Sequence, residues 1–122
     1  MAEVMAGRLA AALIIATGMV SAGPSAVHAA SFPCSQASAP DEIAICRTPD
    51  LNDADVDMSV RYEMLRALLP MGGAGALQDA QRAWLAQRRL CGGDVGCLRS
   101  AYAQRIGALK AGFQQIVSRG PY

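Results

Sequence analysis

Four cysteines, Cys34, Cys46, Cys91 and Cys97, constrain this chain of 122 residues more than any other feature. An even number of cysteines in a small chain is typical of disulfides formed in an oxidising compartment, where they stabilise a domain with a small core. A zinc site is the competing use, but zinc knuckles have cysteines only about two to four residues apart. The cysteines here are more widely spaced. We therefore predict disulfides, with no metal and no other cofactor.

The first 30 residues have the composition of an export signal. A basic residue, Arg8, precedes an apolar stretch over residues 9–20, and small residues then lead to Val27-His28-Ala29. This order is typical of a cleavable secretory signal peptide, whether translation begins at Met1 or at Met5. The apolar stretch is shorter than the roughly 20 residues that span a bilayer, so we expect no stable membrane insertion after cleavage.

Cleavage after Ala29 or Ala30 would leave residues 31–122 as one small periplasmic or secreted domain. The only histidine of the chain, His28, would leave with the signal peptide. A domain without histidine has no Ser-His-Asp or Cys-His catalytic pair and no histidine metal site. We therefore predict that the protein is not an enzyme.

Proline and glycine divide residues 31–122 into four expected helices. Each expected start combines capping residues, proline or acidic residues in the first turn. We expect a short helix capped by Ser38 and ending near Cys46, a second from Pro49 to just before Pro70, a third over about residues 76–90, and a fourth from Asp94 to about residue 118. Short connections make successive helices antiparallel neighbours. The predicted fold class is all-α, a small antiparallel bundle of three longer helices and a short N-terminal helix.

This layout selects one disulfide pairing from the three that four cysteines permit. Cys91 ends the third helix and Cys97 begins the fourth, with three glycines between them. Such a turn brings two Cα atoms within the roughly 4.4–6.8 Å that a disulfide requires. Cys34 lies in the segment that enters the first helix, and Cys46 lies at the end of that helix. We predict the pairs Cys34–Cys46 and Cys91–Cys97.

Apolar residues three or four positions apart predict one buried face on the second helix and one on the fourth. The third helix carries the only tryptophan, Trp84, on its inward face. A tryptophan at helical spacing is usually a packing residue, so we place Trp84 in the core between the second and fourth helices. The alternative is that Trp84 is an anchor for a binding partner. Tyr62 and Tyr102 are expected beside it.

Two polar residues, Gln81 and Arg88, share that inward face of the third helix. Buried polar groups need partners, so one interpretation is a partly buried network with Asp55 and the tyrosines across the bundle. The alternative is a small rotation of the helix that brings both polar ends to solvent. We favour the network, because arginine can bury its stem against apolar surface.

Charge is distributed unevenly along the chain. Residues 31–63 carry seven acidic and two basic side chains, whereas residues 64–122 carry two acidic and eight basic ones. The favoured interpretation is that acidic and basic helices pack side by side. The alternative is an acidic surface with Asp50, Asp53 and Asp57, which would attract a basic partner. We exclude nucleic acid as a partner, because no basic cluster is present.

A resemblance to a known family is carried by residues spread over 34–109. They are Cys34, Glu42, Ile45-Cys46, Leu51, Asp55, Tyr62, Gln81, Trp84-Leu85, Arg88, Cys91, Cys97-Leu98, Tyr102, Arg105 and Leu109. With these residues and spacings the chain resembles the LprI-like family of small, exported, disulfide-containing helical proteins, which is named for a lysozyme inhibitor. The named inhibitor is a lipoprotein. This chain lacks the lipidation motif, since Phe32-Pro33 precedes its first cysteine.

The resemblance implies an envelope protein that inhibits lysozyme by binding it. The alternative is a structural or ligand-binding envelope module without lysozyme contact. Three candidate contact surfaces follow from the sequence: the junction held by Cys91–Cys97, the glycine-rich turn over residues 70–76, and the acidic residues Asp50, Asp53 and Asp57.

Overall fold

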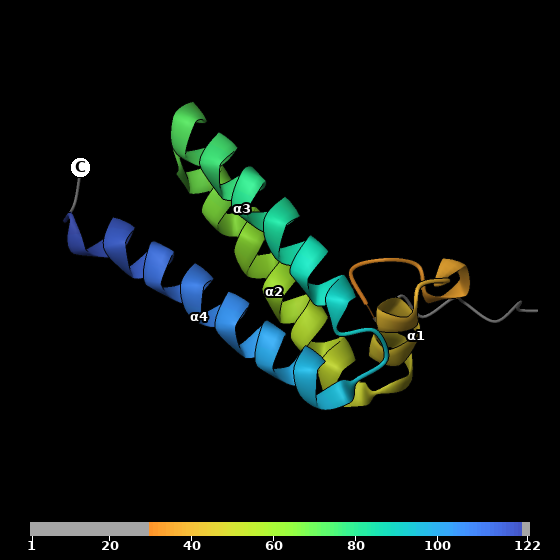
Figure 1. Cartoon of the computed structure of the whole chain (residues 1–122). Coiled ribbons are helices and arrows are strands. Elements are labelled where there is room, and N and C mark those ends of the chain that lie inside the picture. Colours follow the sequence, from red (N-terminus) through yellow and green to blue (C-terminus); the bar gives the residue numbers. More distant parts are fainter. Residues whose placement is uncertain (1–29, 121–122) are drawn as a thin grey trace, which may run out of the picture.

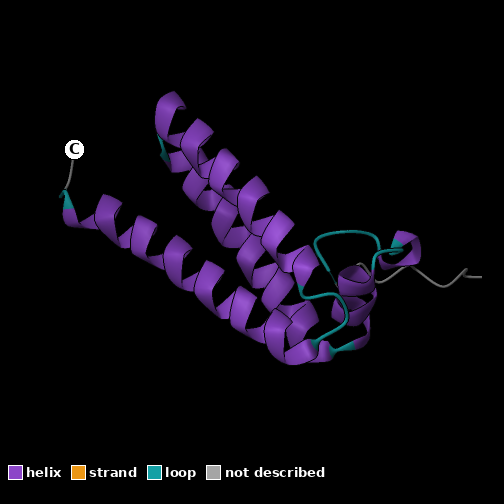
Figure 2. Cartoon of the chain, in the orientation of Figure 1, coloured by secondary structure: helices purple, strands orange, loops and turns teal. Residues whose placement is uncertain are grey.

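The computed structural model describes residues 30–120, so the predicted signal peptide lies outside the described residues. A short 3-10 helix η1 (Cys34–Gln36) precedes the helices α1 (Pro40–Arg47), α2 (Pro49–Leu68), α3 (Met71–Leu90) and α4 (Val95–Ser118). Within residues 30–120 the secondary structure is helical, with no strand (Figure 2). Three long helices and one short helix confirm the predicted fold class.

The helix α3 begins earlier than the sequence analysis predicted. The expected turn over residues 70–76 is wrong, because Gly72, Gly73 and Gly75 all lie inside α3. Each glycine costs a helix interior up to about 1 kcal/mol relative to alanine, so the local preference is against this start. A Cβ built on Gly72 or Gly75 would meet no atom within 4 Å, whereas one built on Gly73 would lie 3.4 Å from Cδ2 of Leu69, in the connection between α2 and α3.

The two predicted capping residues have different outcomes. Asp94 caps α4, since its Oδ1 accepts a hydrogen bond from the Cys97 amide at 2.9 Å, as predicted. Ser38 is not the cap of α1, which is Ala39. The side chain of Glu42 reaches back instead and accepts hydrogen bonds from the Ser38 and Ala39 amides at 3.3 and 3.4 Å. The carboxylate of Glu42, in the first turn of α1, thus takes the capping role that was expected of the Ser38 hydroxyl.

The buried core is bounded by α1 at one end and extends along α2 as far as Leu65, close to the C-terminal end of that helix. Its members are Ala30, Ile45, Leu51, Met58, Leu65, Trp84, Leu98, Tyr102 and Leu109. The first buried residue of α3 is Gln81 and the last of α4 is Leu109, so the far ends of both helices are largely exposed. Figure 1 shows the corresponding shape, in which α2 and α3 run side by side while α4 diverges toward its C-terminal end. No helix within residues 30–120 is long and apolar enough to cross a membrane.

Both predicted disulfides are confirmed. Cys34–Cys46 joins the segment around η1 to the end of α1, with a Cα–Cα distance of 5.8 Å. Cys91–Cys97 joins the end of α3 to the first turn of α4, with a Cα–Cα distance of 5.5 Å. Each disulfide links neighbouring elements, so neither reaches across the bundle.

Ion pairs connect the acidic and basic parts of the chain. Arg88 of α3 contacts Asp41 of α1 and Asp55 of α2, and Arg99 of α4 contacts Asp50 of α2. These contacts support the interpretation that the uneven charge reflects helices packing side by side.

Candidate functional site

A buried arginine fixes the C-terminal end of α3. Arg88 is only 4% exposed, and its Nε donates a hydrogen bond to Asp41 Oδ2 at 2.9 Å. The guanidinium carbon lies 5.8 Å from the ring centroids of both Phe32 and Trp84, within cation–π range. Burial by itself would lower the pKa of Arg88, but contact with Tyr102 and Asp41 raises it above the ordinary value. Arg88 therefore stays charged and joins α1 to α3.

Tyr102 connects this arginine to a second buried carboxylate. Its hydroxyl donates to Asp55 Oδ1 at 2.7 Å and accepts from Arg88 Nη1 at 3.3 Å. Burial and the adjacent Asp55 raise the pKa of the Tyr102 phenol well above its usual value, so the phenol stays protonated. Asp41 and Asp55 are 1% and 0% exposed. The favoured network thus exists, and the alternative in which Arg88 reaches solvent is wrong.

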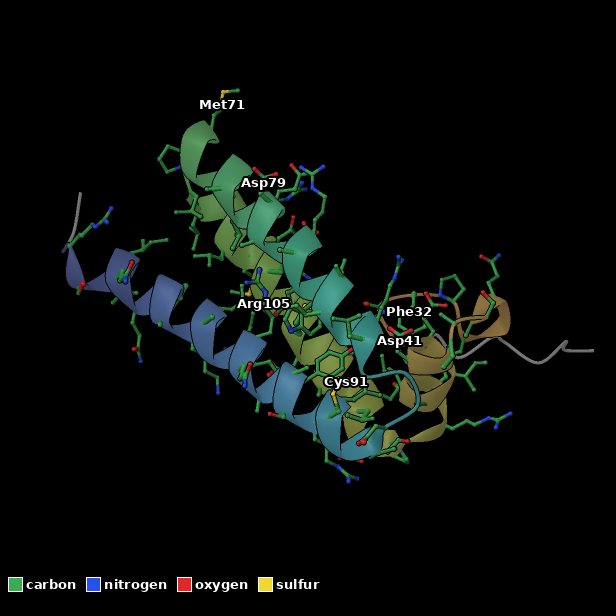
Figure 3. All side chains as sticks on the ribbon, viewed as in Figure 1. Phe32, Asp41, Met71, Asp79, Cys91 and Arg105 are labelled. Atoms are coloured by element: carbon green, nitrogen blue, oxygen red, sulfur yellow. A yellow bond between two sulfur atoms is a disulfide. The ribbon has the colours of Figure 1, made fainter. Side chains whose placement is uncertain are left out.

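A second polar group lies further along the interface of α3 and α4. Arg105 Nε donates to Gln81 Oε1 at 2.8 Å, and Gln81 Nε2 lies 3.0 Å from the sulfur of Met58. Burial lowers the pKa of Arg105, and the nearby Tyr62 partly offsets that effect. Figure 3 shows Arg105 between α4 and α3. Gln81 is therefore buried in the interface rather than turned to solvent.

Sequence reasoning did not assign Asp41 or Arg105 to this network. Asp41 lies in the first turn of α1, where an acid is favourable in any case, and no local signal distinguishes that use from a buried ion pair. Arg105 carried a signal that could have been used, because it shares the inward face of α4 with Leu98, Tyr102 and Leu109.

Trp84 and the two tyrosines lie at different depths. Trp84 is 8% exposed, its ring meets Tyr102 edge-on at 5.1 Å, and its Nε1 donates to the Ala101 carbonyl at 3.1 Å. Tyr102 is 1% exposed. Tyr62 is only partly buried and stacks with Arg66, whose guanidinium carbon lies 6.0 Å from its ring centroid.

The junction between α3 and α4 is a short turn closed by Cys91–Cys97. The Asp94 amide donates to the Cys91 carbonyl at 3.1 Å, and Gly92 has a φ of 55°, which favours glycine. Leu90 is 87% exposed just before the turn, and Arg89 is exposed and makes no ion pair within residues 30–120. Arg89 and Leu90 thus point outward from the last turn of α3, between the buried Arg88 and the disulfide-closed turn. Figure 3 shows Cys91 at this end of the bundle, near Asp41, and Met71 at the opposite tip.

The three candidate acidic residues differ in their electrostatic surroundings. Asp50 makes two hydrogen bonds with Arg99, at 2.7 and 3.1 Å, and this contact lowers the pKa of Asp50. Asp57 lies 2.9 Å from Arg61 on the same helix. Asp53 is exposed and makes no ion pair among the described residues. Arginines therefore compensate two of the three negative charges.

Within residues 30–120 no three histidine, cysteine, aspartate or glutamate side chains group in a way that could hold a metal ion.

The buried network and the junction lie within a stretch of the chain that matches a known family. The family described as Lysozyme inhibitor LprI matches residues 34–109. The chain belongs to the LprI family. The matched range includes both disulfides, the buried network and the junction turn, and it ends at Leu109, the last buried residue of α4. Comparison with curated proteins and with solved structures gave no match.

Proposed function

We propose that this LprI-family protein is exported, loses its signal peptide, and acts in the cell envelope by binding and inhibiting lysozyme rather than by catalysis. The family match over residues 34–109 is the observation that carries this proposal. The two disulfides support it, because such bonds persist in oxidising compartments.

The junction of α3 and α4 is the surface best suited to enter a lysozyme cleft. Glycoside hydrolysis requires a pair of carboxyl groups flanking the sugar chain, so an inhibitor has to cover or fill an acidic cleft. Arg89 offers a guanidinium without an acidic partner, and Leu90 offers an exposed apolar side chain. The Cys91–Cys97 bond and the buried Arg88 hold both in place, and preorganisation of this kind reduces the entropy lost on binding.

The other two candidate surfaces receive less support. Residues 71–76 belong to α3, so the expected glycine-rich turn is absent there. The acidic surface retains one carboxylate without an arginine partner, Asp53, because Asp50 and Asp57 are paired. Long-range attraction of a basic lysozyme by this surface would be weak and would decrease further as salt rises.

The test is a titration of the purified oxidised protein into lysozyme while the lysis of cell walls is followed. We expect lysis to slow with increasing protein. Arg89→Glu and Leu90→Asp should abolish inhibition, whereas Asp53→Lys, an equally exposed change on α2, should preserve it. Circular dichroism of each variant checks that the fold is intact.

Two results would change the assignment. Undiminished lysis at a large molar excess would leave the alternative of an envelope module that does not contact lysozyme. Inhibition that survives both junction variants but is lost with Asp53→Lys would move the binding surface to the acidic face of α2.

A further inference from the structure

The segment that enters the domain is held by the buried network. Ala30 is only 6% exposed, although it is the first described residue. The Ser31 amide nitrogen donates to Asp55 Oδ2 at 2.7 Å, and Phe32 lies against the Arg88 guanidinium. Ser31 is itself exposed and Phe32 is partly buried, so this segment lies at the edge of the network and is joined to it by these two contacts.

The charges of this network do not balance. Two buried carboxylates, Asp41 and Asp55, share one buried guanidinium, that of Arg88. Arg88 lies closer to Asp41, at 2.9 Å, than to Asp55, at 3.7 Å. Tyr102 bonds to Asp55 as a neutral phenol, and the other buried cation, Arg105, makes no ion pair within residues 30–120. Asp55 therefore shares Arg88 with Asp41, at the longer distance. Incompletely compensated buried charge destabilises a fold, so a second cation beside Asp55 would stabilise this one.

We propose that removal of the signal peptide supplies this cation: the new α-ammonium group of the mature chain pairs with Asp55. This inference rests on the export processing proposed above. Hydrolysis of the Ala30–Ser31 bond consumes one water, leaves a carboxylate on the signal peptide and leaves an ammonium on the Ser31 nitrogen. That nitrogen is the atom already 2.7 Å from Asp55 Oδ2. Of the two predicted cleavage positions, the one after Ala30 places the new ammonium on this nitrogen, and it removes the buried Ala30 from the mature chain.

The consequence is a fold that is completed by processing. In the precursor the Ser31 nitrogen is an amide, which can donate a hydrogen bond but carries no charge. Cleavage turns the same contact into a charge-assisted hydrogen bond, which is roughly twice as strong as a neutral one. The precursor therefore has a weaker tendency to fold before transport than the mature protein has after it.

The test compares two forms of the exported protein. Mass spectrometry first identifies the N-terminal residue, which we expect to be Ser31. One portion is then acetylated in urea at neutral pH, where the α-amino group is less protonated than the Lys110 side chain, and is refolded with its disulfides intact. Near neutral pH the equilibrium constant for unfolding should be about tenfold to a hundredfold larger for the acetylated form than for the form with a free α-amino group.

The pH dependence of this difference has a definite sign. Pairing with a buried carboxylate raises the pKa of an ammonium above its usual 7.7–8.0 or so. The stabilisation is then complete below that range and is lost as the pH rises through the higher, folded-state value. A difference between the two forms that does not change with pH would overturn the proposal.

Two matched variants test whether the stability difference between the free and acetylated forms depends on the Asp55 carboxylate. Asp55→Asn should remove the difference between the free and acetylated forms, whereas Asp53→Asn, on the exposed face of α2, should preserve it. If Asp55→Asn does not fold, the ion pair is tested instead by the pH dependence of the stability difference between the free and acetylated forms of the unaltered protein. Equal stability of the free and acetylated forms would overturn the ion pair, whatever the lysozyme assay shows. A mature chain that begins beyond Ser31 would overturn the processing on which the ion pair depends.

Discussion

Arg88 and Arg99 make similar ion pairs in opposite environments. The Arg88–Asp41 pair is almost completely buried, whereas the side chains of Arg99 and Asp50 are 55% and 56% exposed. Water screens the exposed pair, and measured contributions of such pairs are small. Removing one partner of a buried pair leaves an uncompensated charge in the core. Distance alone therefore does not indicate which pair matters for stability.

We expect Arg88→Met to lower the free energy of unfolding by about 3–5 kcal/mol, because Asp41 would remain buried without its partner. Arg99→Met, the matched change in the exposed pair, should lower the free energy of unfolding far less, because water screens that pair. Urea denaturation followed by circular dichroism measures both values. Equal losses in the two variants would contradict the interpretation of Arg88 as the anchor of α3.

Tyr102 predicts how stability changes in alkaline solution. The raised pKa keeps its phenol protonated in the fold, while the unfolded chain titrates near the ordinary value of about 10. A group with a raised folded-state pKa stabilises fully below its unfolded pKa, and that contribution is lost as the pH rises above it. We expect Tyr102→Phe to reduce the alkaline slope of the unfolding free energy, measured by urea denaturation between about pH 8 and 11. An unchanged slope would show that another group causes it.

At the scale of elements, glycines of α4 differ in what surrounds them. A Cβ built on Gly107 would meet no atom within 4 Å, whereas one built on Gly112 would lie 3.0 Å from Leu65 Cδ2 of α2. The close approach of α2 and α4 at this point depends on the missing side chain. Gly107 has no comparable role, so only the entropic cost of glycine in a helix acts there.

Gly107→Ala should therefore stabilise the protein by about 0.5–1 kcal/mol, because alanine favours the helix and fits the open space. Gly112→Ala should stabilise the protein less than Gly107→Ala, or destabilise it, because the Leu65 side chain has to move to make room for the new methyl group. Thermal denaturation of both variants compares them within one helix. A Gly112→Ala protein that gains as much as the Gly107→Ala protein would show that α2 and α4 are not closely packed here.

On the scale of the whole molecule, the two disulfides stabilise by similar amounts but hold different parts. In the chain-entropy model, loops as short as these contribute about 2–3 kcal/mol each. Cys34–Cys46 fixes the N-terminal segment against α1, and Cys91–Cys97 fixes the proposed binding turn.

We expect the double change Cys91→Ser with Cys97→Ser to retain the helical circular dichroism spectrum, lose about 2 kcal/mol of stability and lose most lysozyme inhibition. The matched double change Cys34→Ser with Cys46→Ser should lose about 3 kcal/mol but keep inhibition at a temperature where it is folded. Titration of each double variant into lysozyme, with the lysis of cell walls followed, measures how much inhibition each one retains. If both variants inhibit equally, the Cys91–Cys97 turn is not the binding surface.

Local sequence determined the helices, most of their ends and the disulfide pairing, because each depends on residues close together in the chain. Apolar spacing marks the buried faces of α2 and α4, Asp94 caps the helix that it starts, and Cys91 and Cys97 are only 6 residues apart. The glycines of α3 are the exception, since glycine by itself disfavours a helix, yet Gly72, Gly73 and Gly75 lie inside α3.

Only the tertiary structure decided which charges are buried and which partners they have. Asp41 lies 47 residues from Arg88, and Asp50 lies 49 residues from Arg99. Their sequence surroundings are alike, because each acid lies in the first turn of a helix that begins with proline. What separates them is the packing of α1 across the ends of α2 and α3, which excludes water from one pair and leaves the other exposed. Desolvation depends on every element that surrounds a group, and no local pattern records it.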